Sequence, residues 1–94
     1  MSFNVYIIFT KRSDKYISYV GYAKDIKKRL ILHNSSKGAK FTKGNQWILI
    51  YKKEYLTKSL AMKEEYRLKK DYKLRKNLIN RYLIENENCN FTSL

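Results

Sequence analysis

The stretch FNVYIIFT, residues 3–10, decides how this chain begins to fold. It is a continuous run of mainly β-branched and aromatic side chains, which predicts a buried strand. A polar turn is expected at residues 11–15 (KRSDK), and residues 16–22 (YISYVGY) predict a second strand. Because the connection is short, the two strands are expected to pair antiparallel as a hairpin.

Beyond the hairpin the pattern predicts one more strand and three helices. They are expected over residues 25–34 (helix), 47–55 (strand), 57–70 (helix) and 71–83 (helix), with a polar loop at 35–46. Candidate N-caps are Asp25, then Thr57 or Ser59, then Asp71. The order β-β-α-β-α-α predicts an α/β (α+β) fold, a small three-stranded, largely antiparallel sheet flanked by three helices. Residues 1–84 are expected to form this one domain, and residues 85–94 a polar tail that frays.

The charge of the chain favours a nucleic-acid partner. There are 21 Lys and Arg against 8 Asp and Glu, a formal net charge of +13, and the excess is spread over the body of the chain. Like charges at this density repel one another in a compact state, and a phosphate backbone relieves the repulsion. The alternative is a soluble, lysine-rich protein with no such partner.

Several other classes of protein are disfavoured. The single cysteine, Cys89, excludes an internal disulfide and a cysteine-based zinc cluster. No stretch approaches the roughly 20 apolar residues of a membrane span, and the first residues lack the layout of a signal peptide. A cytoplasmic protein with no membrane partner is therefore expected, or a nuclear one in a eukaryote.

Polar side chains interrupt the apolar stripes of all three predicted helices. They are Arg29 and His33 in the first helix, Glu65 in the second, and Asn77 and Arg81 in the third. Polar groups that face the body of a domain cost free energy unless they are paired or line a cleft. These positions are therefore candidates for a functional site.

Each candidate also has a purely structural interpretation. Arg29 could pair with Glu65 or with Asp25, and His33 could be a hydrogen-bonded residue at the edge of the core. Glu65 and Asn77 could lie on solvated helix faces. Helical spacing alone does not decide between these interpretations.

Five segments, in order, resemble the GIY-YIG nucleases. NVY (4–6) and YVG (19–21) are similar to the two tripeptides that name the family, with Asn4 in place of the first glycine. GYAKDIKKR (21–29) resembles the segment that leads to the family's arginine, and HNSSKGAKFTKG (33–44) the loop of its small stand-alone members. AMKEEYRLKK (61–70) resembles the helix with the metal-binding glutamate. The resemblance covers about residues 3–80 and extends to excision-repair and structure-specific members.

The resemblance implies a metal-dependent DNA endonuclease that hydrolyses phosphodiester bonds in repair, recombination or related DNA processing. It implies that Glu65 binds Mg²⁺ (or Mn²⁺), since a single carboxylate and several waters suit an ion that dehydrates reluctantly. It also carries over Asn77, near an asparagine of some members, as a further catalytic residue.

Four more catalytic residues follow from the same resemblance. Tyr6 matches the tyrosine that acts as general base or orients the attacking water, and Tyr19 the one that binds the water or the phosphate. Arg29 would hold phosphate oxygens through its forked donors. His33 would activate or position Tyr6, or contact phosphate.

Lysines in the loop and the last two helices are expected to contact the DNA backbone. They are Lys37, Lys40 and Lys43, then Lys69, Lys70 and Lys73, with Arg75 and Lys76 as a possible extension. No motif for reading bases is present, so the DNA could be duplex, branched or single-stranded. A non-catalytic or partner-dependent nucleic-acid-binding module on the same fold remains the alternative, and a protein partner or a homodimer is compatible with the sequence.

Overall fold

The computed structural model describes residues 2–35 and 46–92, with side chains as far as residue 86. Three strands, β1 (Phe3–Arg12), β2 (Lys15–Ala23) and β3 (Ile48–Tyr55), form one antiparallel sheet in the order β2-β1-β3. The predicted α+β class and element order are confirmed. None of the helices in the described ranges is long and apolar enough to cross a membrane.

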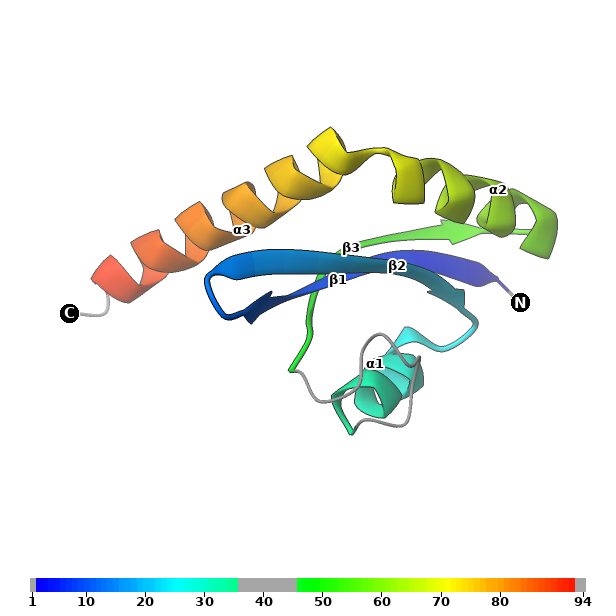
Figure 1. Ribbon diagram of the computed structural model, residues 1–94. Coiled ribbons are helices and arrows are strands. Elements are labelled where there is room, and N and C mark those ends of the chain that lie inside the picture. Colours follow the sequence, from blue (N-terminus) through cyan, green and yellow to red (C-terminus); the bar gives the residue numbers. More distant parts are fainter. Residues whose placement is uncertain (1, 36–45, 93–94) are drawn as a thin grey trace.

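The helices cover both faces of the sheet. α2 (Lys58–Lys70) and α3 (Tyr72–Thr92) lie over one face, and α1 (Ile26–Asn34) lies under the other, so the domain has three layers (Figure 1). β1 is the central strand, and six successive residues from Val5 to Thr10 are buried. This explains the continuous apolar run, since a strand covered on both faces does not alternate with polar residues.

Local chemistry sets where the elements begin. The hairpin turn consists of two residues, Ser13 and Asp14, and Ser13 has a left-handed φ of 56°. At the start of each helix a side-chain oxygen accepts a hydrogen bond from the backbone N–H three residues later. Asp25 accepts from Lys28, Thr57 from Leu60, and Asp71 from Leu74. Thr57, not Ser59, is therefore the cap of α2.

α3 is longer than predicted. It continues to Thr92, so the expected helix end near residue 83 is wrong, and fraying of the tail stays a prediction. No glycine or proline follows residue 44, and without such a residue nothing in the local sequence forces the helix to stop. The proposed domain boundary at residue 84 stays a prediction.

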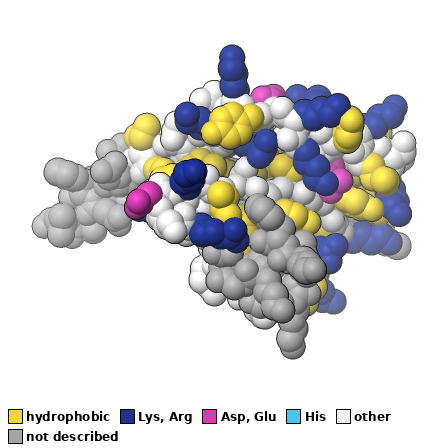
Figure 2. Space-filling view, in the orientation of Figure 1, with side chains coloured by type: hydrophobic (Ala, Val, Ile, Leu, Met, Phe, Trp, Pro, Cys, Tyr) yellow, Lys and Arg dark blue, Asp and Glu magenta, His cyan; other side chains and the backbone are white. Residues whose placement is uncertain are grey.

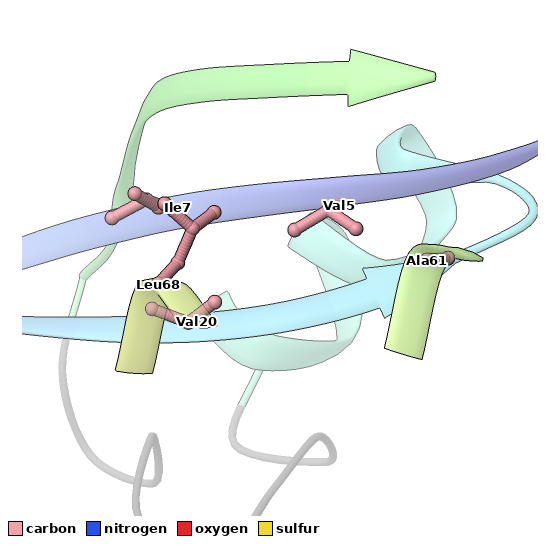
Figure 3. Packing of buried hydrophobic residues seen from close by; sticks show 5 residues of the cluster. All are labelled: Val5, Ile7, Val20, Ala61 and Leu68. Atoms are coloured by element: carbon pink, nitrogen blue, oxygen red, sulfur yellow. The ribbon is translucent and has the colours of Figure 1, made fainter. Parts of the chain in front are cut away.

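Alternate residues of β1 build two separate cores. Val5 and Ile7 face α2 and α3 and pack with Val20, Ala61 and Leu68 (Figure 3). Tyr6 and Ile8 face α1 and pack with Trp47. The second core contains the first tyrosine of the candidate site, so the α1 side of the sheet positions the chemistry.

Candidate active site

The centre of the site is a hydrogen bond between Tyr6 and His33. The Tyr6 Oη atom lies 2.8 Å from His33 Nε2, and the two residues are only 2% and 1% exposed. Tyr6 points from the central strand toward α1, and His33 lies in the last turn of that helix. The predicted inward orientation of His33 is therefore confirmed. Its hydrogen-bond partner is Tyr6, which is itself a predicted catalytic residue.

Gly21 makes room for this hydrogen bond. It lies opposite Tyr6 in the β1–β2 ladder. A Cβ atom at position 21 would lie 2.6 Å from Tyr6 Oη and 2.8 Å from Tyr6 Cζ. Cβ atoms essentially never make contacts this short, so a side chain at position 21 would force the phenol to move. The glycine of the second tripeptide thus has a steric role that the sequence did not reveal.

Tyr19 completes an aromatic cluster around His33. Its ring centroid is 5.1 Å from that of His33, in an edge-to-face arrangement. A Cβ atom on Gly21 would lie 3.1 Å from Tyr19 Cε2. The two motif tyrosines and the histidine therefore form one packed group.

Burial fixes the protonation states of the central pair. It raises the pKa of Tyr6 to about 12, with a further increase from Tyr19, while Arg29 opposes the shift. Burial and then the charge of Arg29 lower the pKa of His33 from its ordinary value of 6.5. Near pH 7 both groups are therefore neutral, and the Tyr6 hydroxyl can donate its proton to an unprotonated Nε2.

Arg29 borders the inward stripe of α1 without being buried in it. It is exposed, yet its guanidinium lies close enough to the Tyr6 hydroxyl to act on it by charge and as a hydrogen-bond donor. It also lines a shallow cavity of about 350 Å³ that includes Lys24 and Lys28. An exposed guanidinium with two lysines beside a buried tyrosine is suited to hold a phosphate group.

Glu65 approaches from the other face of the sheet. It lies on α2 between Ala61 and Leu68, which pack on the strands, and its side chain is 19% exposed. Its charge raises the pKa of Tyr6, as the smallest of the influences on that hydroxyl. Its ion pair is with Lys69, at 3.5 Å, and Asp25 caps α1. Of the two carboxylates that the sequence offered as partners of Arg29, Glu65 thus pairs with Lys69 and Asp25 binds the start of α1.

The donor set fits a metal ion that keeps most of its water. Among the residues described, no group of three or more His, Cys, Asp or Glu side chains could hold an ion. Glu65 offers one accessible carboxylate, which matches the way Mg²⁺ binds through one or two carboxylates together with waters and substrate phosphate. A preformed zinc or calcium cage would need more ligands.

Other predicted residues lie away from this group. Asn77 and Arg81 are exposed on α3, where Leu74 and Leu78 make the packed stripe, so their expected inward position is wrong. The catalytic role of Asn77 stays a prediction. Lys69, Lys70 and Lys73 are exposed on α2 and α3, whereas Lys37, Lys40 and Lys43 lie outside the described residues.

Two asparagines and a tryptophan support the site without having been predicted. Asn34 holds the Trp47 backbone, since its Oδ1 accepts from the Trp47 N–H and its Nδ2 donates to the carbonyl at 3.3 Å. Trp47 is buried beside Tyr19, with 6.5 Å between ring centroids. Asn4 donates to the carbonyls of Ala23 and Lys24, at 3.4 and 3.3 Å, and fixes the end of β2. The one feature of the sequence that could have indicated these contacts is the single tryptophan, Trp47, next to the predicted third strand.

The chain is similar to several bacterial proteins. A UPF0213 protein of Staphylococcus epidermidis is 52% identical over 52 residues, which cover 54% of this chain and 63% of that protein. One of Staphylococcus saprophyticus is 48% identical over 65 residues, 68% of this chain and 78% of that protein. The matching region thus spans less than two thirds of the first of these relatives. No solved structure matches.

The family follows from a longer match. The sequence model of the GIY-YIG catalytic domain matches residues 2–80, which include every described residue of the Tyr6, Tyr19, Arg29, His33 and Glu65 group. Because this match covers most of the chain, the chain belongs to the GIY-YIG family of nucleases.

Proposed function

We propose that this protein is a divalent-metal-dependent DNA endonuclease that acts in the cytoplasm, in repair, recombination or related DNA processing. The observation that supports this most is the 2.8 Å contact between Tyr6 Oη and His33 Nε2 beside Arg29 and Glu65. It joins a hydroxyl to a neutral imidazole, and the charges of a guanidinium and a carboxylate act on the same hydroxyl. These are the groups that phosphodiester hydrolysis requires.

Tyr6 and His33 would act together as the base. A tyrosine whose pKa is raised to about 12 does not ionise by itself near pH 7. The hydrogen bond removes this difficulty, because Tyr6 can take a proton from the attacking water while its own proton passes to His33 Nε2. The water oxygen then bonds to phosphorus as the bond to the leaving oxygen breaks. The lowered pKa of His33 keeps its nitrogen free of a proton beforehand.

Arg29 and Glu65 would stabilise the negative charge that develops on the reacting phosphate, Arg29 directly and Glu65 through a bound metal ion. The exposed guanidinium can bind two oxygens of the reacting phosphate, where negative charge increases in the transition state. Glu65 would hold Mg²⁺ or Mn²⁺, which when bound stabilises charge on the phosphate and the leaving oxygen. Lys69, Lys70 and Lys73 would contact the flanking backbone.

A cleavage assay with a matched control tests the proposal. Labelled single-stranded, duplex, flap and four-way DNA is incubated with Mg²⁺ or Mn²⁺ and wild type, Glu65→Gln or Glu64→Gln. Glu64 is the adjacent residue, its side chain is 18% exposed and it pairs with Arg67 instead. We expect Glu65→Gln to lower the cleavage rate about a hundredfold or more, and Glu64→Gln to change it little.

Binding measured without metal separates the alternatives. Wild type and Glu65→Gln should bind DNA about equally, since the carboxylate does not attract phosphate. Retained binding with no cleavage of any substrate by wild type would favour the non-catalytic or partner-dependent module. Equal losses in Glu64→Gln and Glu65→Gln would remove Glu65 from the mechanism.

A further inference from the structure

A second cavity borders the edge strand β2 and lies on the α3 side of the sheet, whereas Tyr6 and His33 lie on the α1 side. It has a volume of about 650 Å³ and lies between the start of β2 and the first half of α3. β2 is an edge strand that lies in front of the sheet in Figure 1, and Figure 2 shows basic side chains interspersed with exposed hydrophobic ones on this side. The lining includes Tyr16, Tyr72, Lys15, Arg75 and Lys76.

Arg75 gives the cavity a fixed shape. Its guanidinium donates to the carbonyls of Leu68 and Lys69, at 3.1 and 2.9 Å, and to Ser18 Oγ at 2.9 Å. These bonds hold the end of α2 and the start of α3 against β2. Arg75 therefore has a structural role here, and the phosphate contact that the sequence suggested for it stays a prediction.

Two tyrosines are exposed at this cavity. Tyr72 is 65% exposed and Tyr16 is 43% exposed. The Arg75 guanidinium lies 5.8 Å from the Tyr72 ring centroid, and Lys11 Nζ lies 5.6 Å from that of Tyr16. Exposed rings with cations beside them are the combination that binds single-stranded nucleic acid, because unpaired bases stack on the rings while the cations contact phosphates. Bases inside a duplex are already stacked and cannot use them.

The cavity and the candidate active site both border the edge strand β2. Gly21, which lies against the Tyr6 hydroxyl, and Ile17, which lines the cavity, are on the same strand, about 13 Å apart at 3.3 Å per residue. Lys69 links the cavity to Glu65, since its carbonyl accepts from Arg75 and its Nζ lies 3.5 Å from Glu65. A DNA strand that leaves the active site along β2 reaches the cavity within a few nucleotides.

We propose that this cavity binds an unpaired segment of the DNA strand next to the bond that is cut. The proposal rests on the proposed nuclease function and specifies its substrate as DNA with a single-stranded part. Tyr72 stacks with a base, and Lys76 contacts the phosphate backbone.

Binding of oligodeoxythymidylate of 12 nucleotides tests this, measured by fluorescence anisotropy in EDTA so that no cleavage occurs. Tyr72→Ala should weaken binding about tenfold, and Tyr72→Phe, which keeps the ring, less than about twofold. Lys76→Ala should weaken binding more than Lys27→Ala, a matched loss of one exposed lysine on α1. Circular dichroism checks that each variant is folded.

A blunt 12-base-pair duplex supplies the contrast. Tyr72→Ala should change duplex binding less than about twofold, because no unpaired base is offered. No effect of Tyr72→Ala on either DNA, or an equal loss on both, would overturn the proposal. So would a loss in Tyr72→Phe as large as in Tyr72→Ala. Failure of the nuclease function is a separate result, since it shows as absent cleavage whatever the binding.

Discussion

The two faces of the sheet bury different kinds of side chain. The face under α2 and α3 is packed with aliphatic residues, namely Val5, Ile7, Val20, Ala61 and Leu68. The face toward α1 buries Tyr6 and His33, whose polar atoms bond to each other. The same central strand supplies both faces, one residue after the other.

This difference separates stability from chemistry. Aliphatic burial stabilises the fold without directional demands, whereas a buried hydroxyl and imidazole stabilise it little and need a defined geometry. In the described part of the chain, no buried side-chain nitrogen or oxygen lacks a partner. We therefore expect substitutions on the α2 and α3 face to change mainly the free energy of unfolding, and substitutions on the α1 face mainly the cleavage rate.

Leu68→Ala should have the largest effect on stability. Leu68 is fully buried on α2, and its truncation should lower the free energy of unfolding by about 2–5 kcal/mol. Leu60→Ala, on the same helix but half exposed, should lower it by less than about 1 kcal/mol. Urea unfolding measures both values. Similar values for the two variants would show that this face is not the stabilising core.

Gly21→Ala should affect both properties. The added Cβ would lie 2.6 Å from Tyr6 Oη, so the phenol must move, at a cost of about 1–3 kcal/mol. A displaced Tyr6 should lower the cleavage rate about a hundredfold. Urea unfolding and the cleavage assay measure the two effects.

The control for Gly21→Ala is the same change in a Tyr6→Phe background. Without the hydroxyl the shortest contact is gone, and the added Cβ meets Tyr6 Cζ at 2.8 Å and Tyr19 Cε2 at 3.1 Å, so the two losses should be less than additive. Strict additivity in the free energy of unfolding would indicate that the glycine is needed for another reason.

The elements of the fold are predictable from local sequence. The run FNVYIIFT predicts the central strand, and Asp25, Thr57 and Asp71 form caps because an N-cap depends only on residues three positions away. The end of α3 is not predictable in this way. Its sequence contains no stop signal, and helices then continue as far as packing and propensity allow.

The site is predictable only in part, because its geometry depends on contacts between distant segments. Helical spacing places His33 inward, but nothing local indicates that Tyr6 is its partner 27 positions away. The steric role of Gly21 and the Asn34–Trp47 contact likewise depend on strand register and loop closure. For Asn77 the helical spacing predicted an inward position, but the residue is exposed. The spacing of apolar residues does not show which edge of the apolar stripe faces solvent.

Tyr6→Phe should have a moderate effect on stability and a large one on cleavage. It removes the hydroxyl that bonds to His33 Nε2, which should lower the free energy of unfolding by about 1.5 kcal/mol. It also removes the proton acceptor, so cleavage should fall about a hundredfold or more. Tyr51→Phe, a partly buried tyrosine on the other face, is the control and should leave cleavage unchanged. Full activity of Tyr6→Phe would refute the proposed proton transfer from water through Tyr6 to His33.

The smallest expected effect is that of pH on His33. Its folded pKa is below the ordinary 6.5, so the unfolded chain binds the proton more readily. The contribution to stability is therefore complete above pH 6.5 and is lost as pH falls through the folded pKa. Between pH 7 and 6 the free energy of unfolding should fall by no more than about 0.7 kcal/mol.

Urea unfolding of wild type and His33→Gln at the two pH values measures this change. The chain has a single histidine, and carboxylates are already ionised in this range, so the dependence should be absent in the variant. Cleavage should decline over the same acidic range, because a protonated Nε2 cannot accept the proton from Tyr6. Greater stability at pH 6 than at pH 7 would mean that the α1 face holds a charged histidine, and the contrast between the two faces would then rest on an ion instead of a neutral hydrogen bond.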